Sequence, residues 1–261
     1  MTEAEMADCV VVTGAAGDIG RALVTLFLER GKTVVGWDID PVRLADNDAL
    51  FAERYTSVVV DISSADAVAN AYAATTANGS HVAVLINNAG AVTEPRLEQT
   101  DEREWMRDME INLNGAFRCI KAVHPAMAAA GSGAIINVAS VNGVAMYGYP
   151  GYSAAKAGLI QLTKFAATEY GPNGIRVNAI MPGTVRTKAW DERLAVNPAI
   201  MDNVKKYYSL RDVCAPSDIV ELAWFLAYGP SRMITGAVIP IDGGLTAGIG
   251  LVAGEFCGVE F

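Results

Sequence analysis

The most constraining feature of the sequence is a short apolar run that leads directly into a glycine-rich loop. Residues 9–13 are apolar and largely β-branched, which is typical of a strand buried on both faces of a parallel sheet. The loop, residues 14–20, follows at once, and residues 21–31 have helical apolar spacing and end in a glycine. In this order the loop and the helix start present backbone N–H groups to a phosphate. The unit therefore predicts a dinucleotide site; the alternative is a set of tight-turn glycines with no ligand.

The same alternation of strand and helix continues along the chain. Further strands are predicted at 33–37, 57–62, 81–86 and 133–139, with helices at 64–78 and about 100–130. Such alternation predicts an α/β fold with a doubly wound, mostly parallel sheet, the Rossmann fold, whose site lies at the carboxyl ends of the strands. Because no linker, repeat or low-complexity tract interrupts it, we expect residues 1–261 to form a single domain.

The charge and hydropathy of the chain exclude two kinds of partner. A net charge of −9 would repel phosphates, so no nucleic acid is expected as a partner. No apolar run is long enough to cross a bilayer, and the acidic residues 1–8 lack the pattern of a signal peptide. We therefore expect a soluble, cytoplasmic protein that acts on a small molecule and has no membrane partner.

Cysteine and histidine are too sparse and scattered to suggest a metal site. The 4 cysteines have no C-x-x-C spacing and are each expected to be small buried hydrophobes: Cys9, Cys119, Cys214 and Cys257. The 2 histidines are His81 and His124. The sequence supports neither a metal centre nor a Ser-His-Asp triad.

Asp38 stands at the end of the second predicted strand. An acidic side chain there can accept hydrogen bonds from both hydroxyls of an adenosine ribose and would repel a 2′-phosphate, which favours NAD over NADP. The alternative is that Asp38 merely begins the turn towards Pro41. Asp40 suits that role better, because it directly precedes the proline.

Acidic, amide and small residues follow the next predicted strands. They are Asp61 and Ile62 at the end of the third strand and Asn88, Ala89 and Gly90 after the fourth. Such a cluster suits close approach by a ligand, and Gly90 permits the bend. Asn112 lies within the long predicted helix, where an amide is a poor helix former and needs a reason to be present.

Tyr152 and Lys156 lie four residues apart in an Ala-rich, helix-forming stretch, so both project from one face. A cation next to a phenol favours the phenolate, and we expect Lys156 to lower the pKa of Tyr152 so that it exchanges protons with a substrate hydroxyl. Chance pairing on a helix surface is the alternative. Ser140, which follows the fifth predicted strand, would bring a hydroxyl to the same edge of the sheet.

Taken together, these residues resemble the short-chain dehydrogenase/reductase family in its compact single-domain branch. The resemblance covers nearly the whole chain and rests on motifs at the family's spacing: Thr13-Gly14 to Gly20, Asp61, Asn87-Asn88-Ala89-Gly90, Asn112, Ser140, Tyr152-x-x-x-Lys156, Arg176-Val177-Asn178, Pro182-Gly183 and Ile241-Asp242-Gly243-Gly244.

The resemblance implies roles for four catalytic residues. Tyr152 would be the general acid/base, and Ser140 would hold the substrate oxygen and its developing charge. Lys156 would lower the pKa of Tyr152 and hydrogen-bond the nicotinamide ribose. Asn112 would hold a water in a proton relay to solvent.

The resemblance also implies how NAD is bound. Its pyrophosphate would lie at Gly14, Gly17, Asp18, Ile19 and Gly20, its adenosine at Asp38, Asp61 and Ile62, and its other half at Asn88, Ala89, Gly90, Tyr152, Lys156, Pro182, Gly183, Val185 and Thr187. Asp18 departs from the pattern, because the compact branch usually has glycine there. Since an acid facing a pyrophosphate is unfavourable, we expect Asp18 to turn away into the first turn of the helix.

The substrate region is the least determined. Residues 188–212 show no sheet-packing pattern and correspond in the family to a variable lid. This lid is locally basic and aromatic, so it either attracts a polar or anionic substrate or simply faces water. Candidate contacts to a hydroxylated substrate such as a sugar or polyol are Asn142, Tyr147, Tyr149 and Trp190.

The C-terminal extension, residues 245–261, is Gly-rich and apolar. We expect it to pack on another subunit or to close the substrate pocket. The resemblance implies a homotetramer.

Three functions are consistent with these features. The leading one is an NAD-dependent alcohol or sugar dehydrogenase. A 3-oxoacyl-thioester reductase is disfavoured by Asp38, because such reductases in the family generally use NADPH. A non-catalytic dinucleotide-binding regulator is disfavoured by the complete set of Asn112, Ser140, Tyr152 and Lys156.

Overall fold

The computed structural model describes residues 8–51 and 53–260, so the acidic stretch 1–7 and the last residue of the C-terminal extension lie outside the description. A 7-stranded sheet with the order β3-β2-β1-β4-β5-β6-β7 runs through this part of the chain. All its neighbouring strands pair in parallel. The strands are β1 (Asp8–Thr13), β2 (Thr33–Asp38), β3 (Tyr55–Val59), β4 (His81–Asn87), β5 (Gly133–Val138), β6 (Ile175–Pro182) and β7 (Val238–Ile241). The predicted doubly wound α/β sheet is confirmed.

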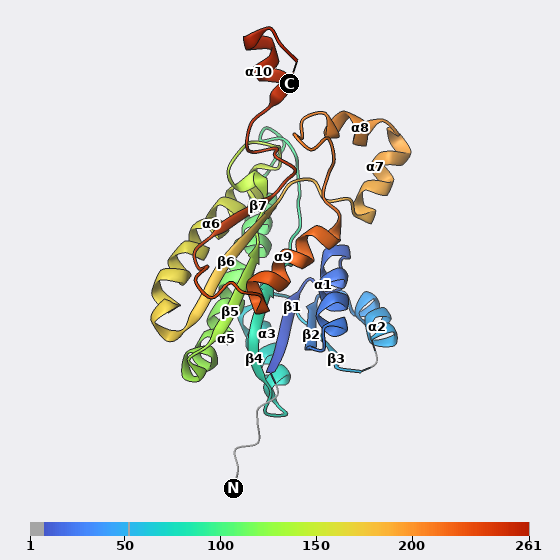
Figure 1. The fold of residues 1–261 in the computed structure, drawn as a ribbon. Helices are drawn as coiled ribbons and strands as arrows, with labels where there is room; N and C mark the ends of the chain where they lie inside the picture. The colour runs from blue at the N-terminus through green and yellow to red at the C-terminus, as the bar shows by residue number, and fades with distance from the viewer. Residues whose placement is uncertain (1–7, 52, 261) are drawn as a thin grey trace.

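Helices cover both faces of the sheet (Figure 1). One face carries α1 (Asp18–Glu29), α2 (Pro41–Leu50) and α9 (Pro216–Tyr228), and the other carries α3 (Ala65–Thr76), α5 (Gly115–Ala130) and α6 (Pro150–Tyr170). In β1, Val10 and Val12 pack into one apolar core while Cys9 and Val11 pack into the other. The strand is thus apolar throughout because both of its faces are buried.

The order of the strands determines where a ligand can bind. β1 lies between β2 and β4, so the connections diverge at this point and leave a crevice at the carboxyl ends. Thr13, Asp38, Asn87, Val138 and Pro182 end their strands on this one edge. Residues far apart in sequence therefore meet there.

Two predicted elements differ from the structure. The third strand spans Tyr55–Val59 and not 57–62, because the chain turns where Ser63 N donates to Asp61 Oδ1 at 2.9 Å. The long predicted helix is divided into α4 (Glu102–Met109), a π-helical turn η1 (Glu110–Asn114) and α5. Asn112 lies in that π-turn, where its side chain makes buried contacts that a regular exposed helix position would not offer.

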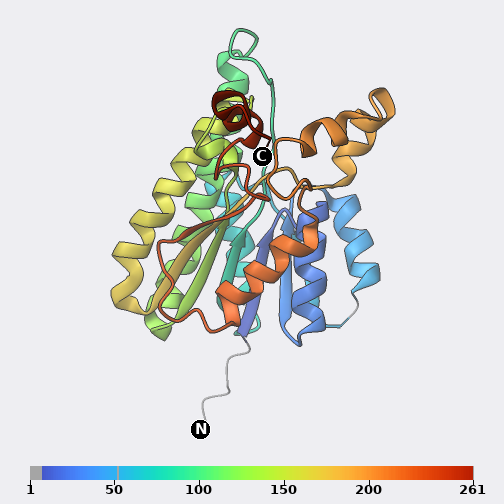
Figure 2. The same cartoon turned by 45° about the horizontal axis from the view of Figure 1, so that its top comes forward.

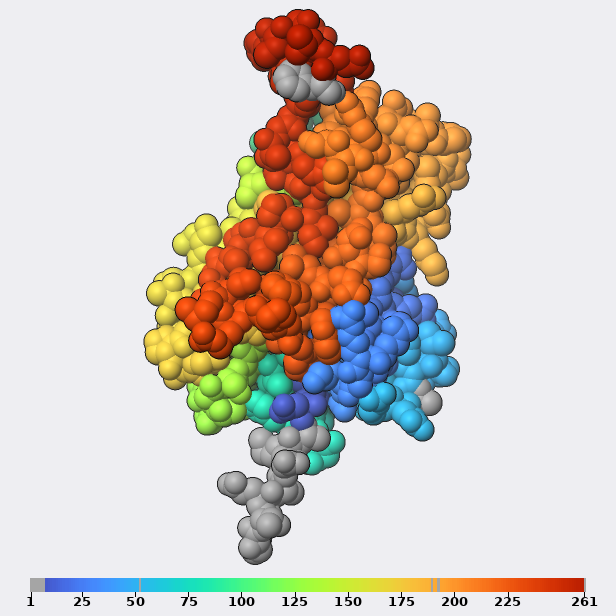
Figure 3. Space-filling view, in the orientation of Figure 1, coloured from blue at the N-terminus to red at the C-terminus, as the bar shows by residue number. Residues whose placement is uncertain are grey.

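The segment 188–212 and the C-terminal extension stand apart from the sheet. The former contains η4 (Lys188–Trp190), α7 (Asp191–Val196) and α8 (Ile200–Lys205), which lie beyond α1 and α2 at the carboxyl edge (Figure 2). We call residues 188–212 the lid segment. α10 (Gly250–Cys257) projects from the body on a narrow neck (Figure 3).

The positions of the cysteines follow from this arrangement. Cys9, Cys119 and Cys214 are buried as expected, but Cys257 is exposed because it lies on the projecting α10, so the prediction for this residue is wrong. Within residues 8–51 and 53–260, no helix is both long enough and apolar enough to cross a membrane.

Short helical turns complete the connections. They are η2 (Val141–Gly143), which follows Ser140, and η3 (Gly171–Asn173), which joins α6 to β6.

Candidate active site

Two positions of the loop after β1 require glycine, because other backbone atoms lie too close for a Cβ. Gly14 has φ +65°, and a Cβ there would lie 2.8 Å from Cα of Ala89. A Cβ on Gly20 would collide with the carbonyl oxygen of Gly14. Gly17 has ordinary space around it. The loop thus packs against the end of β4 and leaves its N–H groups at the start of α1 facing the crevice.

Thr13 and Asn88 hold the ends of β1 and β4 together. The Thr13 hydroxyl accepts hydrogen bonds from the backbone N–H groups of Asn88 and Ala89, at 3.0 and 3.1 Å. The Asn88 side chain donates to the carbonyl oxygens of Thr13 and Gly14, at 3.1 and 3.2 Å. Thr13 is not among the predicted site residues. Its position directly before the glycine loop would have been enough to predict its role at the end of β1.

Asp38 ends β2 with its carboxylate held in place. Its Oδ2 accepts from Ala16 N at 2.9 Å and its Oδ1 from Asp40 N at 3.1 Å. Asp40 caps α2 by accepting from the N–H groups of Val42 and Arg43, so the turn role predicted for Asp40 is confirmed. Asp38 does not cap α2, but through the bond from Asp40 N it also begins the turn, as the alternative predicted, while it lines the crevice.

The crevice consists of two cavities that join. The larger, of about 720 Å³, is lined by the predicted residues Gly14, Gly17, Asp18, Ile19, Gly20, Asp38, Asp61, Ile62, Asn88, Ala89, Gly90 and Thr187. The smaller, of about 290 Å³, is lined by Ser140, Tyr152, Lys156, Pro182, Gly183 and Val185. The cavities share Ile19, Asn88, Gly90 and Ala91. The structure thus brings the predicted dinucleotide residues and three of the four predicted catalytic residues to one cleft, while Asn112 lines neither cavity.

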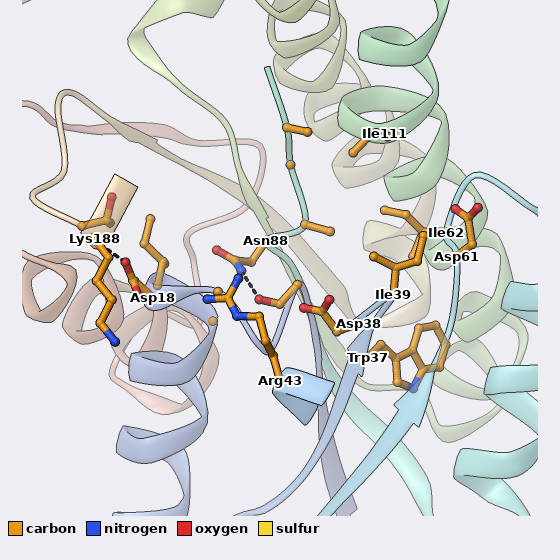
Figure 4. A pocket seen from close by; sticks show the side chains of 18 of the residues that line it. Asp18, Trp37, Asp38, Ile39, Arg43, Asp61, Ile62, Asn88, Ile111 and Lys188 are labelled. Carbon is orange, nitrogen blue, oxygen red and sulfur yellow. Dashed lines mark hydrogen bonds between the residues drawn. The ribbon is translucent and has the colours of Figure 1, made fainter. Parts of the chain in front are cut away.

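Two cations that the sequence did not indicate, Arg43 and Arg107, line the larger cavity together with Lys188 of the basic lid segment. Figure 4 shows Arg43 reaching from α2 towards the space between Asn88 and Asp38. Arg43 follows Asp38 by five residues, so its place at the start of a capped helix was a usable signal. Arg107 lies on α4, and no local sequence pattern predicts that its side chain lines this cavity.

Asp18 is the first residue of α1, as expected, and it lines the larger cavity. Its Oδ2 accepts a hydrogen bond from the backbone N–H of Lys188 at 2.6 Å (Figure 4). The Asp18 carboxylate therefore lies at the N-terminus of α1 and also accepts a hydrogen bond from the lid segment.

Tyr152 and Lys156 lie on one face of α6, and the ammonium of Lys156 is 5.5 Å from the centre of the Tyr152 ring. Lys156 is buried and donates to the carbonyl oxygen of Val138 at 2.7 Å. A Cβ on Gly90 would lie 3.7 Å from this ammonium, which shows how close the end of β4 approaches α6. The predicted pairing on one helix face is confirmed.

The pKa values in this cluster differ from our prediction. Burial lowers the pKa of Lys156 to about 8. Burial raises the pKa of Tyr152 above its ordinary value, hydrogen bonding with Ser140 opposes the rise, and the carboxylate of Asp108 adds to it. The expected lowering of the Tyr152 pKa by Lys156 is therefore not found, because desolvation dominates and the ammonium is engaged by Val138.

Asp108 is a buried acid on α4 that the sequence did not single out. Its Oδ2 accepts from the Thr93 hydroxyl at 2.9 Å, and its Oδ1 has no hydrogen-bond partner in the described part of the chain. A Cβ on Gly151 would lie 2.9 Å from Asp108 Oδ2. The glycine preceding Tyr152 thus lets a carboxylate approach the start of α6.

Asn112 uses its side chain within the protein. Its amide nitrogen donates to the carbonyl oxygens of Ala91 and Asp108, at 2.7 and 3.0 Å, and its Oδ1 accepts from Ala91 N at 3.2 Å. Both N–H groups are committed, so the water expected on Asn112 has only an oxygen lone pair of that side chain available. The structural effect of Asn112 is to fix Ala91 beside Gly90.

The four predicted substrate contacts lie outside the linings of both cavities: Asn142, Tyr147, Tyr149 and Trp190. The Asn142 amide donates to Gly148 O and Ser153 Oγ, at 3.0 and 3.2 Å, so it orders the loop before α6. Tyr147 is exposed.

Tyr149 and Trp190 both contact Arg193. The guanidinium of Arg193 donates to the Tyr149 hydroxyl at 2.7 Å and lies 4.8 Å from the centre of the Trp190 ring. Tyr149 itself has φ +57°, an uncommon conformation for a non-glycine residue. Arg193 thus connects the lid segment to the start of α6.

Comparisons with known proteins agree with this geometry. The family model described as Enoyl-(Acyl carrier protein) reductase matches residues 14–246. Cis-4-hydroxycyclohexanecarboxylate dehydrogenase of Sinomonas cyclohexanicum is 38% identical over 255 residues, which cover 95% of this chain and 100% of that protein.

Solved structures give the same result. A short-chain dehydrogenase/reductase family oxidoreductase from Burkholderia thailandensis has a TM-score of 0.92 and 42% identity, covering 98% of this chain and 99% of that one. A gluconate 5-dehydrogenase from Burkholderia cenocepacia, in complex with NADP and tartrate, has a TM-score of 0.87 and 27% identity, covering 94% and 97%.

The fold, the cleft and these similarities define an oxidoreductase with a Rossmann-type sheet. Within that class, the chain belongs to the short-chain dehydrogenase/reductase family, whose members bind a nicotinamide dinucleotide and act on small molecules.

Proposed function

We propose that this protein is an NAD-dependent dehydrogenase that interconverts a secondary alcohol and its carbonyl, with a sugar, polyol or related hydroxylated molecule as substrate. One observation carries the proposal. Ser140, Tyr152 and Lys156 line a small cavity that opens into the larger one containing the glycine loop and Asp38. A proton-exchanging group therefore adjoins a cleft suited to a dinucleotide.

The residues of the larger cavity fit NAD. At Gly14 and Gly20 a Cβ would collide with the backbone of Ala89 and Gly14, so both glycines maintain the loop shape that would hold a pyrophosphate at the start of α1. Asp38 is oriented by two backbone N–H groups and keeps lone pairs for ribose hydroxyls. When bound, NAD would supply the redox chemistry by accepting or giving a hydride.

Tyr152 is the proposed general acid/base. Because burial raises its pKa, the phenol is protonated at neutral pH and can donate a proton to a carbonyl oxygen. In the oxidative direction its phenolate must form first, so alcohol oxidation should accelerate as the pH rises. Ser140, which lines the same cavity, would hydrogen-bond the substrate oxygen.

Lys156 and Asn112 are proposed to support Tyr152. Lys156 keeps a positive charge beside the phenol below its pKa of about 8, and its remaining N–H groups can reach a ribose hydroxyl. Asn112 holds Ala91 by two hydrogen bonds and so positions Gly90 next to Lys156.

The names of two similar proteins support a substrate that carries a carboxylate as well as a hydroxyl. The exposed guanidinium of Arg193 is a cation near the start of α6, held by Tyr149 and Trp190, although it lines neither cavity. Gluconate and cis-4-hydroxycyclohexanecarboxylate, named for two similar proteins, are both hydroxylated carboxylates. We therefore include such acids in the proposed substrate class.

The reductase alternative has a specific observation in its favour. Arg43 lines the same cavity as Asp38, and a guanidinium there suits a 2′-phosphate. The gluconate 5-dehydrogenase structure contains NADP. An NADPH-dependent reductase of an oxoacyl thioester is thus the second candidate.

We also propose a cytoplasmic homotetramer. α5 and α6 expose Phe117 and Phe165, which are 48% and 64% accessible, on the outer helical layer. Large aromatic side chains exposed on adjacent long helices support an interface between copies of the chain.

The first experiment is a titration of the purified protein with NADH and with NADPH, followed by nicotinamide fluorescence. Tight NADH binding and weak NADPH binding are expected. Turnover is then measured with NAD and a panel of sugars, polyols, hydroxylated carboxylates and simple secondary alcohols. Tighter binding of NADPH than of NADH would favour the oxoacyl-thioester reductase. Absence of turnover with every compound of the panel would overturn the proposed substrate class.

A further inference from the structure

The strongest feature outside the proposed chemistry is the contact between Asp18 and Lys188. These residues are 170 positions apart, yet Asp18 Oδ2 accepts from Lys188 N at 2.6 Å. Asp18 begins α1 directly after the glycine loop, and Lys188 begins η4 of the lid segment. Figure 4 shows the two facing each other at one side of the larger cavity.

The contact lies where the lid segment leaves the sheet. Val185 makes an isolated parallel bridge with Cys214, and Arg186 N donates to Cys214 O at 2.8 Å. Thr187 and Lys188 come next, and both line the larger cavity. The hydrogen bond to Asp18 therefore orders the first residues that extend from the sheet across the dinucleotide side of the cleft.

The lid segment is also held on the substrate side. Arg193 reaches the Tyr149 hydroxyl at 2.7 Å, just before α6. Asp18 thus supplies the contact on the dinucleotide side, and Tyr149 supplies the one near Tyr152.

An acid at a helix N-terminus is favourable by itself, but this does not explain the contact. Asp66 occupies the first turn of α3 and is exposed there. The macrodipole would favour Asp18 equally without a partner. The short hydrogen bond to a backbone N–H requires in addition that the carboxylate point towards the lid segment.

We propose that Asp18 is a positioning residue that holds Thr187 and the start of the lid segment, Lys188, against the dinucleotide cavity. The proposal rests on the proposed function, since it assigns the larger cavity to NAD. Asp18 acts through the backbone of Lys188, which leaves the Lys188 ammonium available to the negatively charged dinucleotide.

Two variants separate the hydrogen bond from the charge. Asp18→Asn removes the charge but keeps an oxygen that can accept from Lys188 N. Asp18→Ala removes both. Asp66→Ala, which deletes an acid from the first turn of another helix, is the matched control for loss of helix-dipole stabilisation.

Hydrogen exchange on the protein without dinucleotide is the first readout. Exchange of the Lys188 amide should be about two- to tenfold faster in Asp18→Ala than in Asp18→Asn, the size expected for one net hydrogen bond. Asp66→Ala should exchange at the wild-type rate at this amide. Equal exchange in the wild type and Asp18→Ala would overturn the proposal.

Dinucleotide affinity is the second readout. Because both variants are neutral at position 18, their comparison cancels the repulsion between carboxylate and pyrophosphate. Asp18→Ala should bind NADH about two- to tenfold more weakly than Asp18→Asn. Equal dissociation constants would overturn the positioning role even if the exchange rates differ. Failure of the wild type to bind NADH or NADPH would overturn the proposed function instead, while the exchange result would still report the Asp18 contact.

Discussion

Lys156 Nζ donates a hydrogen bond to the carbonyl oxygen of Val138 at 2.7 Å, inside the protein and beside the ring of Tyr152. One buried cation thus fixes the end of β5, the strand that precedes Ser140, to α6, the helix that carries Tyr152. Its burial has a consequence for stability, because the charged form is penalised in the folded state.

Lys156→Met should change how stability depends on pH. The folded pKa of Lys156 is about 8 against an ordinary 10.5, so the folded state binds fewer protons between these values. The free energy of unfolding of the wild type, relative to the variant, should therefore rise by about 3 kcal/mol from pH 8 to pH 10.5 and be constant below pH 8. Urea unfolding at several pH values measures this.

Lys164 provides the control for that experiment, because it is an exposed lysine on the same helix. Lys164→Met should give a difference in unfolding free energy that hardly varies with pH. If the difference in unfolding free energy for Lys156→Met were also independent of pH, burial would not lower the pKa of Lys156 as stated here.

Tyr152→Phe should remove turnover and leave dinucleotide binding intact. Loss of the proton-exchanging phenol should lower the rate about 10²- to 10⁴-fold. Tyr170→Phe is the matched control, since Tyr170 lies at the other end of α6 and stacks on His124 with 3.9 Å between ring centres. Substantial turnover by Tyr152→Phe would mean that another group exchanges the proton.

Asp108→Asn should shift the pH profile of alcohol oxidation towards lower pH. The Asp108 carboxylate helps to raise the pKa of Tyr152, so a neutral amide should let the phenolate form more readily. The amide oxygen can still accept from Thr93, which preserves the local packing. Glu102→Gln, at the exposed start of the same helix, should leave the profile unchanged. An unshifted profile for Asp108→Asn would exclude this electrostatic effect.

Asp38→Ser should improve NADPH binding relative to NADH. Removing one carboxylate relieves an unfavourable contact with a 2′-phosphate of about 1 to 2 kcal/mol, which is about 5- to 30-fold in the ratio of dissociation constants. Asp46→Ser, an exposed acid on α2, controls for the general change in charge. An unchanged ratio would remove Asp38 as the specificity residue and direct attention to Arg43.

Phe165→Asp should reduce the mass of the assembly measured by light scattering. Phe165 is 64% accessible on α6, and a charge there would not enter an apolar interface. Phe256→Asp on the projecting α10 is the comparison, since Phe256 is 87% accessible. Dissociation by Phe256→Asp alone would move the interface to the C-terminal extension.

Local patterns were sufficient for most of the framework. The apolar run before Gly14 predicted β1 because a strand buried on both faces needs no alternation. The spacing of Tyr152 and Lys156 placed them on one helix face because an α-helix repeats every 3.6 residues. The break within the long helix was not predicted, since the π-turn at Asn112 depends on hydrogen bonds to Ala91 from another segment.

By itself the sequence determined the first five strands of a parallel α/β sheet, the glycine loop at Gly14 and Gly20, and the arrival of Asp38, Ser140 and Tyr152 at one sheet edge; β6 and β7 were not predicted. These follow from periodicity and from the parallel alignment of the strands. Only the tertiary structure decided that Asp18 meets Lys188 and that burial raises the pKa of Tyr152. Such effects depend on which distant segments pack together and how much water they exclude, and neither is encoded in the spacing of neighbouring residues.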